Sequence, residues 1–423
     1  MIQGVFGPWD ELLAKDRLFP MQSNKVMQSS LRPVELLVLQ GTPFCNLNCH
    51  YCDLSATSRR SKQVMPFELI ERLFCQLRDG RLLSAELTIV WHSGEPLTLP
   101  PEYYEEAISR LMRLAQEGGS GAPRLHFDFQ TNGVLIDKAW CEFFARHRHH
   151  LDLGVSCDGP ADLHDRHRTN WGGRGTHAQT VRGMDLLELH GIPYNIIAVV
   201  TADTLSQPDA FYEFFAKRRK QLTGFHFNVL ANGEDGGEGV GYGADDRDRY
   251  FEFFRRLLTL SRREEGEDKL QIRNFSHTLG RILAAEGEDR PRYVAEGTAP
   301  LRQLNLDALG NVTTFYAGLS VDTLADLYGD GNGFGLGNLN QLSLSEMLSS
   351  DKLERMINDF AVSTRYCETN CDYFDVCTGG FEITKRLKHG RFDAGETIEC
   401  ATHVKTLIDA MIADISEHLE HVD

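Results

Sequence analysis

Three cysteines near the N-terminus are spaced closely enough to bind metal together. Cys45, Cys49 and Cys52 form a C-x3-C-x2-C array within the segment GTPFCNLNCHYCDL, residues 41–54. Thiolates are ligands for soft metals, and cysteine thiolates hold the irons of iron–sulfur clusters. Three cysteines on one short loop can ligate three irons of a four-iron cube, which leaves the fourth iron open to a small molecule.

Zinc is the alternative that this spacing leaves open. A structural zinc site takes four ligands, usually as two separated pairs. His50 offers a fourth ligand, but no second pair of cysteines lies nearby in the sequence. The spacing therefore favours an iron–sulfur cluster over zinc.

A second group of cysteines stands in the last third of the chain. Its members are Cys367, Cys371, Cys377 and Cys400. Four cysteines match one fully ligated cluster, and they also match one zinc site of four thiolates. The remaining cysteines are isolated in the sequence, and we expect them to be small buried hydrophobic residues. They are Cys75, Cys141 and Cys157.

Alternating strand and helix patterns predict how the first cysteine group is positioned. Short apolar runs bounded by turn residues predict strands at 34–40, 86–92, 125–130, 151–157, 194–200 and 224–230. Helical patterns lie between them, at 66–79, 101–117, 137–147, 177–190 and 208–220, and two more follow at 246–265 and 275–286. This alternation predicts an α/β fold with a parallel sheet, closed or partial as a barrel, and chemistry at the carboxyl ends of the strands. The first cysteine loop follows the first predicted strand.

Composition and charge exclude several classes of protein. The 423 residues exceed one ordinary domain, and 41% hydrophobic and 25% charged residues are globular values. The net charge of −17 argues against a nucleic-acid partner held by general electrostatics. No secretory signal and no apolar run of about 18 residues is present, so we expect no membrane span. Ten cysteines without export suggest reduced thiols and a cytoplasmic protein.

The first cysteine motif resembles that of the radical S-adenosylmethionine (SAM) enzymes. The resemblance rests on the C-x3-C-x2-C array, on Tyr51 before the last cysteine, and on the position after an early strand. In that family the open iron binds the amino and carboxylate groups of SAM, and one electron cleaves SAM to methionine and a 5′-deoxyadenosyl radical. The resemblance implies a partial (β/α)6 barrel, with the cluster held by the three cysteines.

Further motifs resemble the SAM-binding positions of that family. The segment WHSGEPL at 91–97 is similar to the GGEP motif, with Ser93 in place of the first glycine, and it implies that Gly94 and Glu95 bind the amino group of SAM. Ser156 and Arg168 would contact the carboxylate and ribose. The complete set of implied SAM-binding residues is Tyr51, Ser93, Gly94, Glu95, Pro96, Asn132, Ser156, Asp158 and Arg168.

The second cysteine group resembles the SPASM extension of peptide-modifying radical SAM enzymes. The motif is Cys367-x3-Cys371-x5-Cys377-Thr-Gly-Gly, with a first spacing one residue longer than usual. Full SPASM domains carry two auxiliary [4Fe–4S] clusters. Phe315 and Phe381 stand where two ligands of the first auxiliary cluster would be, whereas the ligands of the second are all present. The resemblance implies a small SPASM/Twitch-like α+β domain with one auxiliary cluster, and therefore two [4Fe–4S] clusters in the chain.

Three segments narrow the resemblance to one subgroup. GNVTTF at 310–315, FGLGNL at 334–339 and GETIEC at 395–400 resemble cyclophane-forming peptide maturases, including those of Gly-rich-repeat (Grr) peptides. The resemblance implies an oxidoreductase that joins a side-chain carbon to an aromatic ring in a ribosomally made precursor peptide (RiPP). FYAGL at 315–319 and GGFEI at 379–383 differ from that subgroup. Thioether formation, epimerisation and formylglycine-type oxidation remain as alternatives, and so does a zinc-bound interaction protein without catalysis.

The resemblance also suggests partners, domains and one catalytic candidate. Tyr316 stands where sulfatase-maturing relatives place an aspartate, and it is the candidate for proton handling or substrate packing. The expected partners are the precursor peptide, an external electron donor such as flavodoxin or ferredoxin, and a separate leader-recognition protein. The expected domains are an N-terminal extension at 1–33, the barrel at 34–235, a linker with bridging helices at 236–296 and the auxiliary-cluster domain at 297–423. We expect the extension to be too short for a leader-binding domain.

Overall fold

The structure is a computed structural model that describes residues 33–229, 246–263, 269–285, 299–315 and 324–419. Three features of the sequence analysis lie outside the described residues. They are the 1–33 extension up to residue 32, the parts of the expected linker at 236–245, 264–268 and 286–296, and Tyr316.

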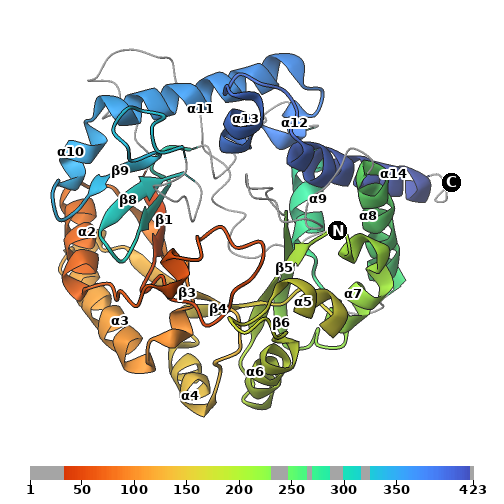
Figure 1. Ribbon diagram of the computed structural model, residues 1–423, viewed down its shortest axis with the longest axis horizontal. Helices are drawn as coiled ribbons and strands as arrows, with labels where there is room; N and C mark the ends of the chain where they lie inside the picture. The colour runs from red at the N-terminus through yellow and green to blue at the C-terminus, as the bar shows by residue number, and fades with distance from the viewer. Residues whose placement is uncertain (1–32, 230–245, 264–268, 286–298, 316–323, 420–423) are drawn as a thin grey trace.

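Six parallel strands alternate with helices and form a partial barrel. The strands are β1 (Val34–Leu39), β2 (Leu83–Trp91), β3 (Arg124–Thr131), β4 (Leu151–Ser156), β5 (Tyr194–Val200) and β6 (Leu222–Val229). Each strand pairs in parallel with the next one. Figure 1 shows the strands on the inside and the helices on the outside of the curved sheet. The predicted α/β fold is confirmed, and all six predicted strands are present.

The helices cover the outer face of the sheet in chain order. They are α2 (Phe67–Asp79), α3 (Pro101–Gln116), α4 (Lys138–His147), α5 (Ala161–His167), α6 (His177–Leu189), α7 (Pro208–Ala216), α8 (Asp246–Arg263) and α9 (Arg273–Ala285). The sequence analysis did not predict α5, whose 7 residues give too short a periodic pattern. The α7 helix ends at Ala216, so the basic residues 217–220 lie in the turn before β6.

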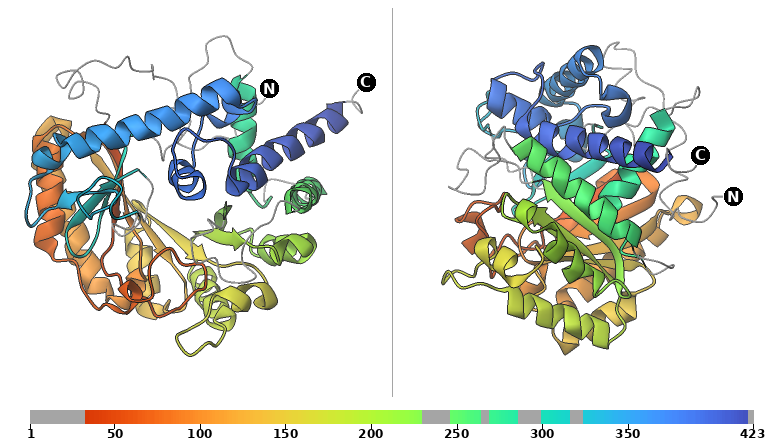
Figure 2. Two further views of the ribbon diagram at one scale, coloured as in Figure 1. Left: turned by 45° about the horizontal axis from the view of Figure 1, so that its top comes forward. Right: turned by 90° about the vertical axis from the view of Figure 1, so that its right-hand side faces the viewer.

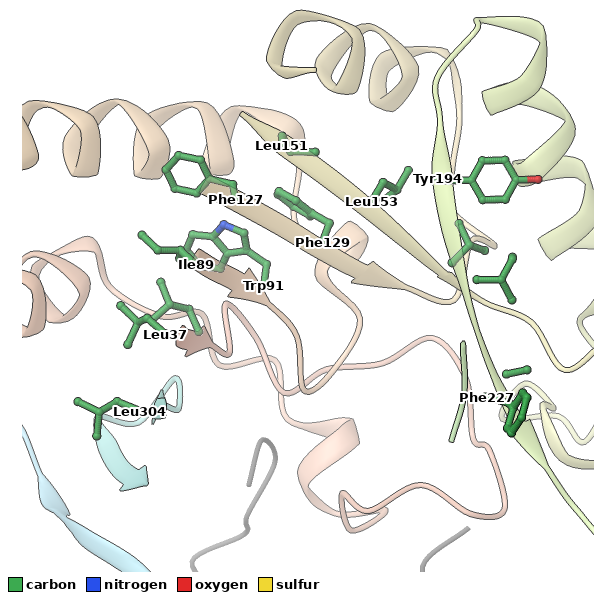
Figure 3. Packing of buried hydrophobic residues seen from close by; sticks show 14 of the residues in the cluster. Leu37, Ile89, Trp91, Phe127, Phe129, Leu151, Leu153, Tyr194, Phe227 and Leu304 are labelled. Atoms are coloured by element: carbon green, nitrogen blue, oxygen red, sulfur yellow. The ribbon is translucent and has the colours of Figure 1, made fainter. Parts of the chain in front are cut away.

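Alternation along the strands separates an apolar outer face from a polar inner one. On β3, Leu125, Phe127 and Phe129 are buried against the helices, whereas the intervening residues are partly exposed. Trp91 and Phe129 pack edge-on against Tyr104 of α3, with ring centroids 5.1 and 4.8 Å away. Figure 3 shows Trp91 and Phe129 together with Ile89 of β2 and Leu37 of β1. This continuous apolar layer fixes the positions of the strand ends that carry the site.

The C-terminal third extends the same sheet. β7 (Gln303–Leu306) pairs in parallel with β1, and β8 (Asn311–Thr314) and β9 (Gly335–Asn338) follow in antiparallel order. The strand order is therefore β6-β5-β4-β3-β2-β1-β7-β8-β9 in one nine-stranded sheet. No break in the sheet accompanies the predicted domain boundary at 297, because β7 lies directly beside the first strand of the barrel.

A group of helices completes the C-terminal third. They are α10 (Leu344–Leu348), α11 (Asp351–Asn370), α12 (Phe374–Cys377), α13 (Glu382–His389) and α14 (Thr406–Leu419), with a π-helical segment, Cys400–Lys405, before the last. Figure 2 shows α11 crossing one end of the barrel and α14 lying along α8. Of the helices in the described ranges, none is long and apolar enough to cross a membrane.

Candidate active site

The first cysteine group lies on the loop that leaves β1, at the carboxyl end of the barrel. Cys45 and Cys49 are partly buried, and Cys52 is exposed. The pKa of Cys45 is raised to about 12 and that of Cys49 to about 11, mainly by burial, with smaller contributions from the neighbouring thiols. The three thiols are therefore close enough to repel one another as thiolates. A bound cation favours the thiolate form and would remove this repulsion.

Contacts with the segment that follows α5 hold this cysteine loop in place. The indole nitrogen of Trp171 donates to the carbonyl oxygen of Cys45 at 2.9 Å, and the backbone nitrogen of Asn48 donates to the carbonyl oxygen of Thr169 at 2.7 Å. The guanidinium of Arg60 lies 4.4 Å from the centre of the Trp171 ring. The loop is thus fixed by residues far away in the sequence rather than by a short turn of its own.

The predicted SGEP segment packs directly beneath the cysteine loop. Gly94 has a φ of +133°, and a Cβ atom there would lie 2.1 Å from the carbonyl oxygen of Thr42. Only glycine permits this close approach. Ser93 also has a positive φ, of 65°, and Pro96 begins a short 3-10 turn, Pro96–Thr98. The tight backbone brings the end of β2 against the start of the loop that carries the thiols.

Glu95 connects the ends of two strands behind that loop. Its side chain is buried and accepts hydrogen bonds from Thr131 Oγ1 at 2.7 Å, from the backbone nitrogen of Asn132 at 2.8 Å and from that of Leu97 at 2.9 Å. Burial raises the pKa of Glu95 to about 7 although these donors lower it. A carboxylate has about four acceptor positions. Three of them are used here, so one remains for a ligand such as an ammonium group.

Asn132 continues this arrangement toward the thiols. Its Nδ2 donates to Asn46 Oδ1 at 2.8 Å and lies 3.9 Å from Cys45 Sγ, while Thr180 donates to its carbonyl oxygen at 3.0 Å. The predicted SAM-binding residue Asn132 therefore touches the cysteine loop itself. Ser156, at the carboxyl end of β4, is partly exposed, as a ligand contact requires.

A buried ion pair forms the other side of the site. Arg168 Nε donates to Asp158 Oδ2 at 2.9 Å and Nη2 donates to Oδ1 at 3.1 Å, and both side chains are less than a tenth exposed, at 8% and 3%. The hydroxyl of Tyr51 and the backbone nitrogen of Val199 also donate to this carboxylate. Burial would raise the pKa of Asp158, but the charge of Arg168 and the other contacts bring it below its usual range.

The ion pair with Asp158 limits which donors Arg168 can offer to SAM. Asp158 takes two of the five N–H donors of Arg168, one on Nε and one on Nη2, so Nη1 and the second hydrogen of Nη2 would be left for the carboxylate or ribose of SAM. The Arg168 guanidinium also lies 5.4 Å from the Tyr51 ring and acts electrostatically on Cys49. Sequence reasoning found all three residues but missed that Asp158 holds the arginine, because nothing in the local pattern indicates which side chain an arginine meets.

The interior of the barrel carries a polar column that sequence reasoning missed. His126, Asp128 and Gln130 alternate with the buried residues of β3, and His126 Nε2 lies 3.0 Å from Asp152 Oδ2 on β4. Gln130 Nε2 donates to Asp128 Oδ2 at 3.1 Å, and Asp128 Oδ1 is buried without a hydrogen-bond partner. Burial raises the pKa of Asp128 to about 7. The alternation RLHFDFQT was visible in the sequence and would have identified this column.

The second cysteine group surrounds a cavity of about 60 Å³ in the C-terminal third. Cys367 lies in α11, Cys371 ends that helix, Cys377 ends α12 and Cys400 begins the π-helical segment. The pKa of Cys400 is raised to about 12, mainly by burial, and the thiols of Cys377 and Cys371 contribute to this rise. The structure thus brings together all four predicted cysteines, although 33 residues separate the first from the last.

The arrangement of these side chains does not suit a single metal ion. Within the described ranges, no three His, Cys, Asp or Glu side chains are placed to hold one ion. A tetrahedral zinc site with Zn–S bonds of about 2.3 Å needs thiolates roughly 3.8 Å apart. A four-iron cube binds each thiolate through a different iron and therefore spaces them more widely. The four cysteines around the C-terminal cavity match in number the ligands of one fully ligated four-iron cluster.

Aromatic side chains pack around Phe315, which stands where the SPASM pattern would have a cysteine. Phe315 is fully buried and stacks on Phe360, with ring centroids 4.1 Å apart and an interplanar angle of 20°. Phe334 and Phe392 pack around the same Phe360 ring, at 6.3 and 6.2 Å. Phe381 has a left-handed backbone with φ of 62° and lines the four-cysteine cavity. Phe315 therefore serves the apolar core of this region.

Several proteins are similar to this chain, two of the three described here over most of its length and one over less than half. The uncharacterised protein sll1766 of Synechocystis is 30% identical over 387 residues, which cover 92% of this chain and 93% of that protein. The serine-type anaerobic sulfatase-maturating enzyme of Bacteroides thetaiotaomicron is 33% identical over 188 residues, 44% of each chain. The cysteine-type anaerobic sulfatase-maturating enzyme of Clostridium perfringens is 24% identical over 355 residues, 82% of this chain and 88% of that enzyme.

Two solved structures share the fold. Native anSMEcpe with bound AdoMet and the Cp18Cys peptide superimposes with a TM-score of 0.70 at 21% identity, covering 92% of this chain and 100% of that chain. SuiB of Streptococcus suis bound to the precursor peptide SuiA gives a TM-score of 0.60 at 17% identity, covering 88% and 77%.

A family model agrees with the site geometry. The model of the radical SAM superfamily matches residues 39–215, which begin at the end of β1 and include the cysteine loop, the SGEP segment and the Asp158–Arg168 pair. The match covers the same loops that the fold gathers at the carboxyl end of the barrel. The chain therefore belongs to the radical SAM superfamily and is an enzyme whose cofactors are SAM and [4Fe–4S] clusters.

Proposed function

We propose that this enzyme modifies a ribosomally made precursor peptide by joining a side-chain carbon to an aromatic ring, which closes a cyclophane macrocycle. The observation that carries the proposal is the presence of two cysteine sites of different kinds in one chain. One is an open three-cysteine loop at the mouth of the barrel, and the other is an enclosed four-cysteine cavity. Similar proteins named as sulfatase-maturating enzymes, and SuiB with its bound precursor peptide, support a peptide or protein substrate.

The two sites divide the reaction into two tasks. We assign the SAM-binding cluster to Cys45, Cys49 and Cys52, and one auxiliary cluster to Cys367, Cys371, Cys377 and Cys400. When bound, the first cluster and SAM supply the radical that removes a hydrogen atom from the substrate. Bond formation to an aromatic ring then requires the loss of one proton and one electron from the substrate. The auxiliary cluster is the proposed acceptor of the electron.

The residues around the first site bind and orient SAM in this proposal. The free acceptor position of Glu95 takes the amino group, as the SGEP resemblance implies. Nη1 of Arg168 and the hydroxyl of Ser156 take the carboxylate and ribose. Asp158 and Tyr51 keep the guanidinium in a fixed orientation, which reduces the side-chain entropy lost when SAM binds.

The barrel interior offers a proton acceptor for the same reaction. Asp128 has a free carboxylate oxygen, and its raised pKa of about 7 lies in the range suited to a general base near neutral pH. His126 and Asp152 lie next along the column, 3.0 Å apart, and act electrostatically on Asp128. Tyr316, the candidate from sequence, remains a prediction for proton handling or substrate packing.

A second candidate function is oxidation of one side chain to formylglycine. The sulfatase-maturating enzymes among the similar proteins favour it, since one of them is 33% identical over 188 residues, which is 44% of this chain. Against it stands Phe315, which is committed to apolar packing at a position where the family pattern has a cluster ligand. We therefore place cross-linking first.

Partners follow from the chemistry. The cluster that cleaves SAM needs an external electron donor of the flavodoxin or ferredoxin class, and a leader-recognition protein would deliver the peptide. We place the enzyme in a reducing compartment such as the cytoplasm, because seven of the ten cysteines are assigned to clusters and need to stay reduced.

Co-expression with small peptides encoded beside its gene tests the proposal. We expect a product that has lost a pair of hydrogens and whose tandem mass spectrum shows two residues linked through carbon. A mass change confined to one residue would replace cross-linking by oxidation. Linkage through a cysteine sulfur would indicate thioether formation, and an unchanged mass with deuterium incorporated from solvent would indicate epimerisation.

A further inference from the structure

A buried lysine touches one of the cysteines of the C-terminal cavity. Lys385 lies in α13 and its side chain is almost fully buried, with 2% of the residue exposed. Its Nζ lies 2.9 Å from Cys367 Sγ and 2.9 Å from Ser363 Oγ. Ser363 is one helical turn before Cys367 in α11 and is itself fully buried. The lysine is thus held against the cysteine by a second, independent hydrogen bond.

The charge of this lysine is not balanced by a carboxylate. An ammonium group is costly to bury unless it is paired and hydrogen-bonded. In the part of the chain that the structure describes, no Asp or Glu forms an ion pair with Lys385 within 4.0 Å, in contrast to Lys405, which lines the same cavity and pairs with Glu396 at 2.8 Å. The thiolate of Cys367 is therefore the natural counter-charge for Lys385.

Such a contact has a known effect on an iron–sulfur cluster. The reduction potential of a cluster depends on its net charge, on hydrogen bonds to its sulfurs and on its exposure to solvent. A positive charge beside a ligand sulfur stabilises the reduced cluster, which carries one more negative charge, more than the oxidised one. The burial of Lys385 strengthens this effect because little water screens the charge.

We propose that Lys385 is a positioning residue that raises the reduction potential of the C-terminal cluster by donating a hydrogen bond to the Cys367 thiolate. The inference rests on the proposed function in that it takes this cluster as the acceptor of the substrate electron. One electron enters the cluster from the substrate and leaves to an external acceptor of the flavodoxin class. Lys385 forms and breaks no bond in this transfer.

The test measures the potential of the C-terminal cluster alone. A full-length parent variant in which Cys45, Cys49 and Cys52 are alanine keeps about four irons, those of the C-terminal site. In this parent, Lys385→Met removes the charge and the donor but keeps the apolar stem, and Lys385→Arg keeps the charge. Lys405→Met is the matched control, because it removes a cation from the same cavity whose charge Glu396 already balances.

Redox titration followed by electron paramagnetic resonance gives the midpoint potential of each variant without substrate. We expect Lys385→Met to hold its electron at least tenfold less tightly, which is a shift of about 59 mV to lower potential for a one-electron couple. Lys385→Arg should recover most of this shift, and Lys405→Met should show a smaller one.

Several outcomes would overturn the inference. An unchanged midpoint in Lys385→Met with full iron content would do so, and so would a shift in Lys405→Met as large as that in Lys385→Met. Loss of iron in both Lys385 variants would show that the lysine only supports the fold. If the parent variant lacks the four irons, the four C-terminal cysteines hold no cluster and the inference falls. If the potential shifts as expected but the natural enzyme leaves its co-expressed peptide unmodified, the role of Lys385 stands and the cross-linking function is contradicted.

Discussion

The two cysteine sites of this chain use the same ligand atoms in opposite surroundings. At the barrel mouth, three cysteines lie on a loop with Cys52 exposed, and the nearby cation Arg168 is neutralised by Asp158. In the C-terminal third, four cysteines enclose a small cavity, and the buried cation Lys385 has the Cys367 thiol as its neighbour instead of a carboxylate. In the proposed function, the first site admits a ligand at its open iron, and the second site holds a fully ligated cluster.

The difference shows how a protein can divide cluster chemistry between binding and electron storage. An open coordination position has value only if a substrate or cofactor can reach it, so the first loop must remain accessible. A cluster that only accepts electrons gains from complete ligation and from buried donors to its sulfurs. Substitutions at the two sites should therefore impair different steps of the reaction.

The largest contrast comes from removing the open site. Replacing Cys45, Cys49 and Cys52 together by alanine should abolish 5′-deoxyadenosine formation, because the electron has no route into SAM. Iron content should fall from about eight to about four per chain, the content of one remaining four-iron cluster. Iron analysis and chromatography of the reaction mixture measure both quantities. About twelve irons in the unmodified enzyme would contradict a single auxiliary cluster.

Removing one cysteine of the C-terminal site should stop the reaction at a step after SAM cleavage. Cys371→Ala should still make 5′-deoxyadenosine but little or no modified peptide, because the substrate electron has lost its acceptor. Metal sites also couple to folding, so circular dichroism and iron content are measured beside activity. Cys75→Ala, at an isolated cysteine outside both sites, is the control. Normal peptide product from a folded Cys371→Ala enzyme with a vacant second site would rule out a required role for this cluster.

Removing the carboxylate that pairs with Arg168 tests how much the buried ion pair contributes to stability and to SAM binding at the first site. Asp158→Asn leaves a buried arginine without a carboxylate, which we expect to destabilise the enzyme by about 3–5 kcal/mol and to weaken SAM binding. Asp209→Asn, which breaks the more exposed pair with Arg256, should cost at most about 1 kcal/mol. Thermal unfolding and SAM titration measure the two effects. Equal losses of stability in both variants would mean that burial of the Asp158 pair is unimportant.

Neutralising Asp128 should change how stability depends on pH. Burial raises its pKa from 3.8 to about 7, so the folded state binds the proton more tightly than the unfolded state. The resulting stabilisation is complete below pH 3.8 and is lost as the pH rises to about 7. Relative to the wild type, Asp128→Asn should gain stability over this window, by up to about 4 kcal/mol.

The neighbours of Asp128 set the control for that measurement. His126, Asp152 and Arg273 face its carboxylate from β3, β4 and α9 and titrate or carry charge in both proteins. The difference between variant and wild type isolates Asp128 because these groups are common to both. Unfolding midpoints at several pH values between 4 and 8 give the two curves, and parallel curves would contradict a raised pKa.

Local patterns predicted the barrel well because each of its units is a local repeat. All six strands and seven of the helices up to Ala285 could be located from apolar runs, helical periodicity and turn residues, within a few residues of their ends. The cysteine groups were found because their spacing in the sequence reflects a shared ligand. Each of these patterns spans only a short stretch of the chain, so a single sequence is enough to recognise it.

The features that the sequence did not predict depend on contacts between distant residues. The pairing of β1 with β7 joins residues 36 and 303, and the contact of Lys385 with Cys367 joins α13 to α11, with α12 between them in the sequence. No periodic pattern identifies such partners. The Asp158–Arg168 pair could have been suspected, since both residues carried SAM-binding predictions, but their mutual hydrogen bonds are a property of the folded segment alone.

The place of β1 between β2 and β7 has a consequence for synthesis of the protein. Arg302, which precedes β7, pairs with Glu35 of β1 from 267 residues away, so β1 leaves the ribosome long before its second neighbour exists. During that interval the apolar segment VELLVL presents an unpaired strand edge, which is a template for aggregation. Pairing over such a distance also slows folding. A nascent chain that stops before Gln303 should therefore depend on chaperones, and the C-terminal third completes the barrel as well as carrying a second set of cysteines.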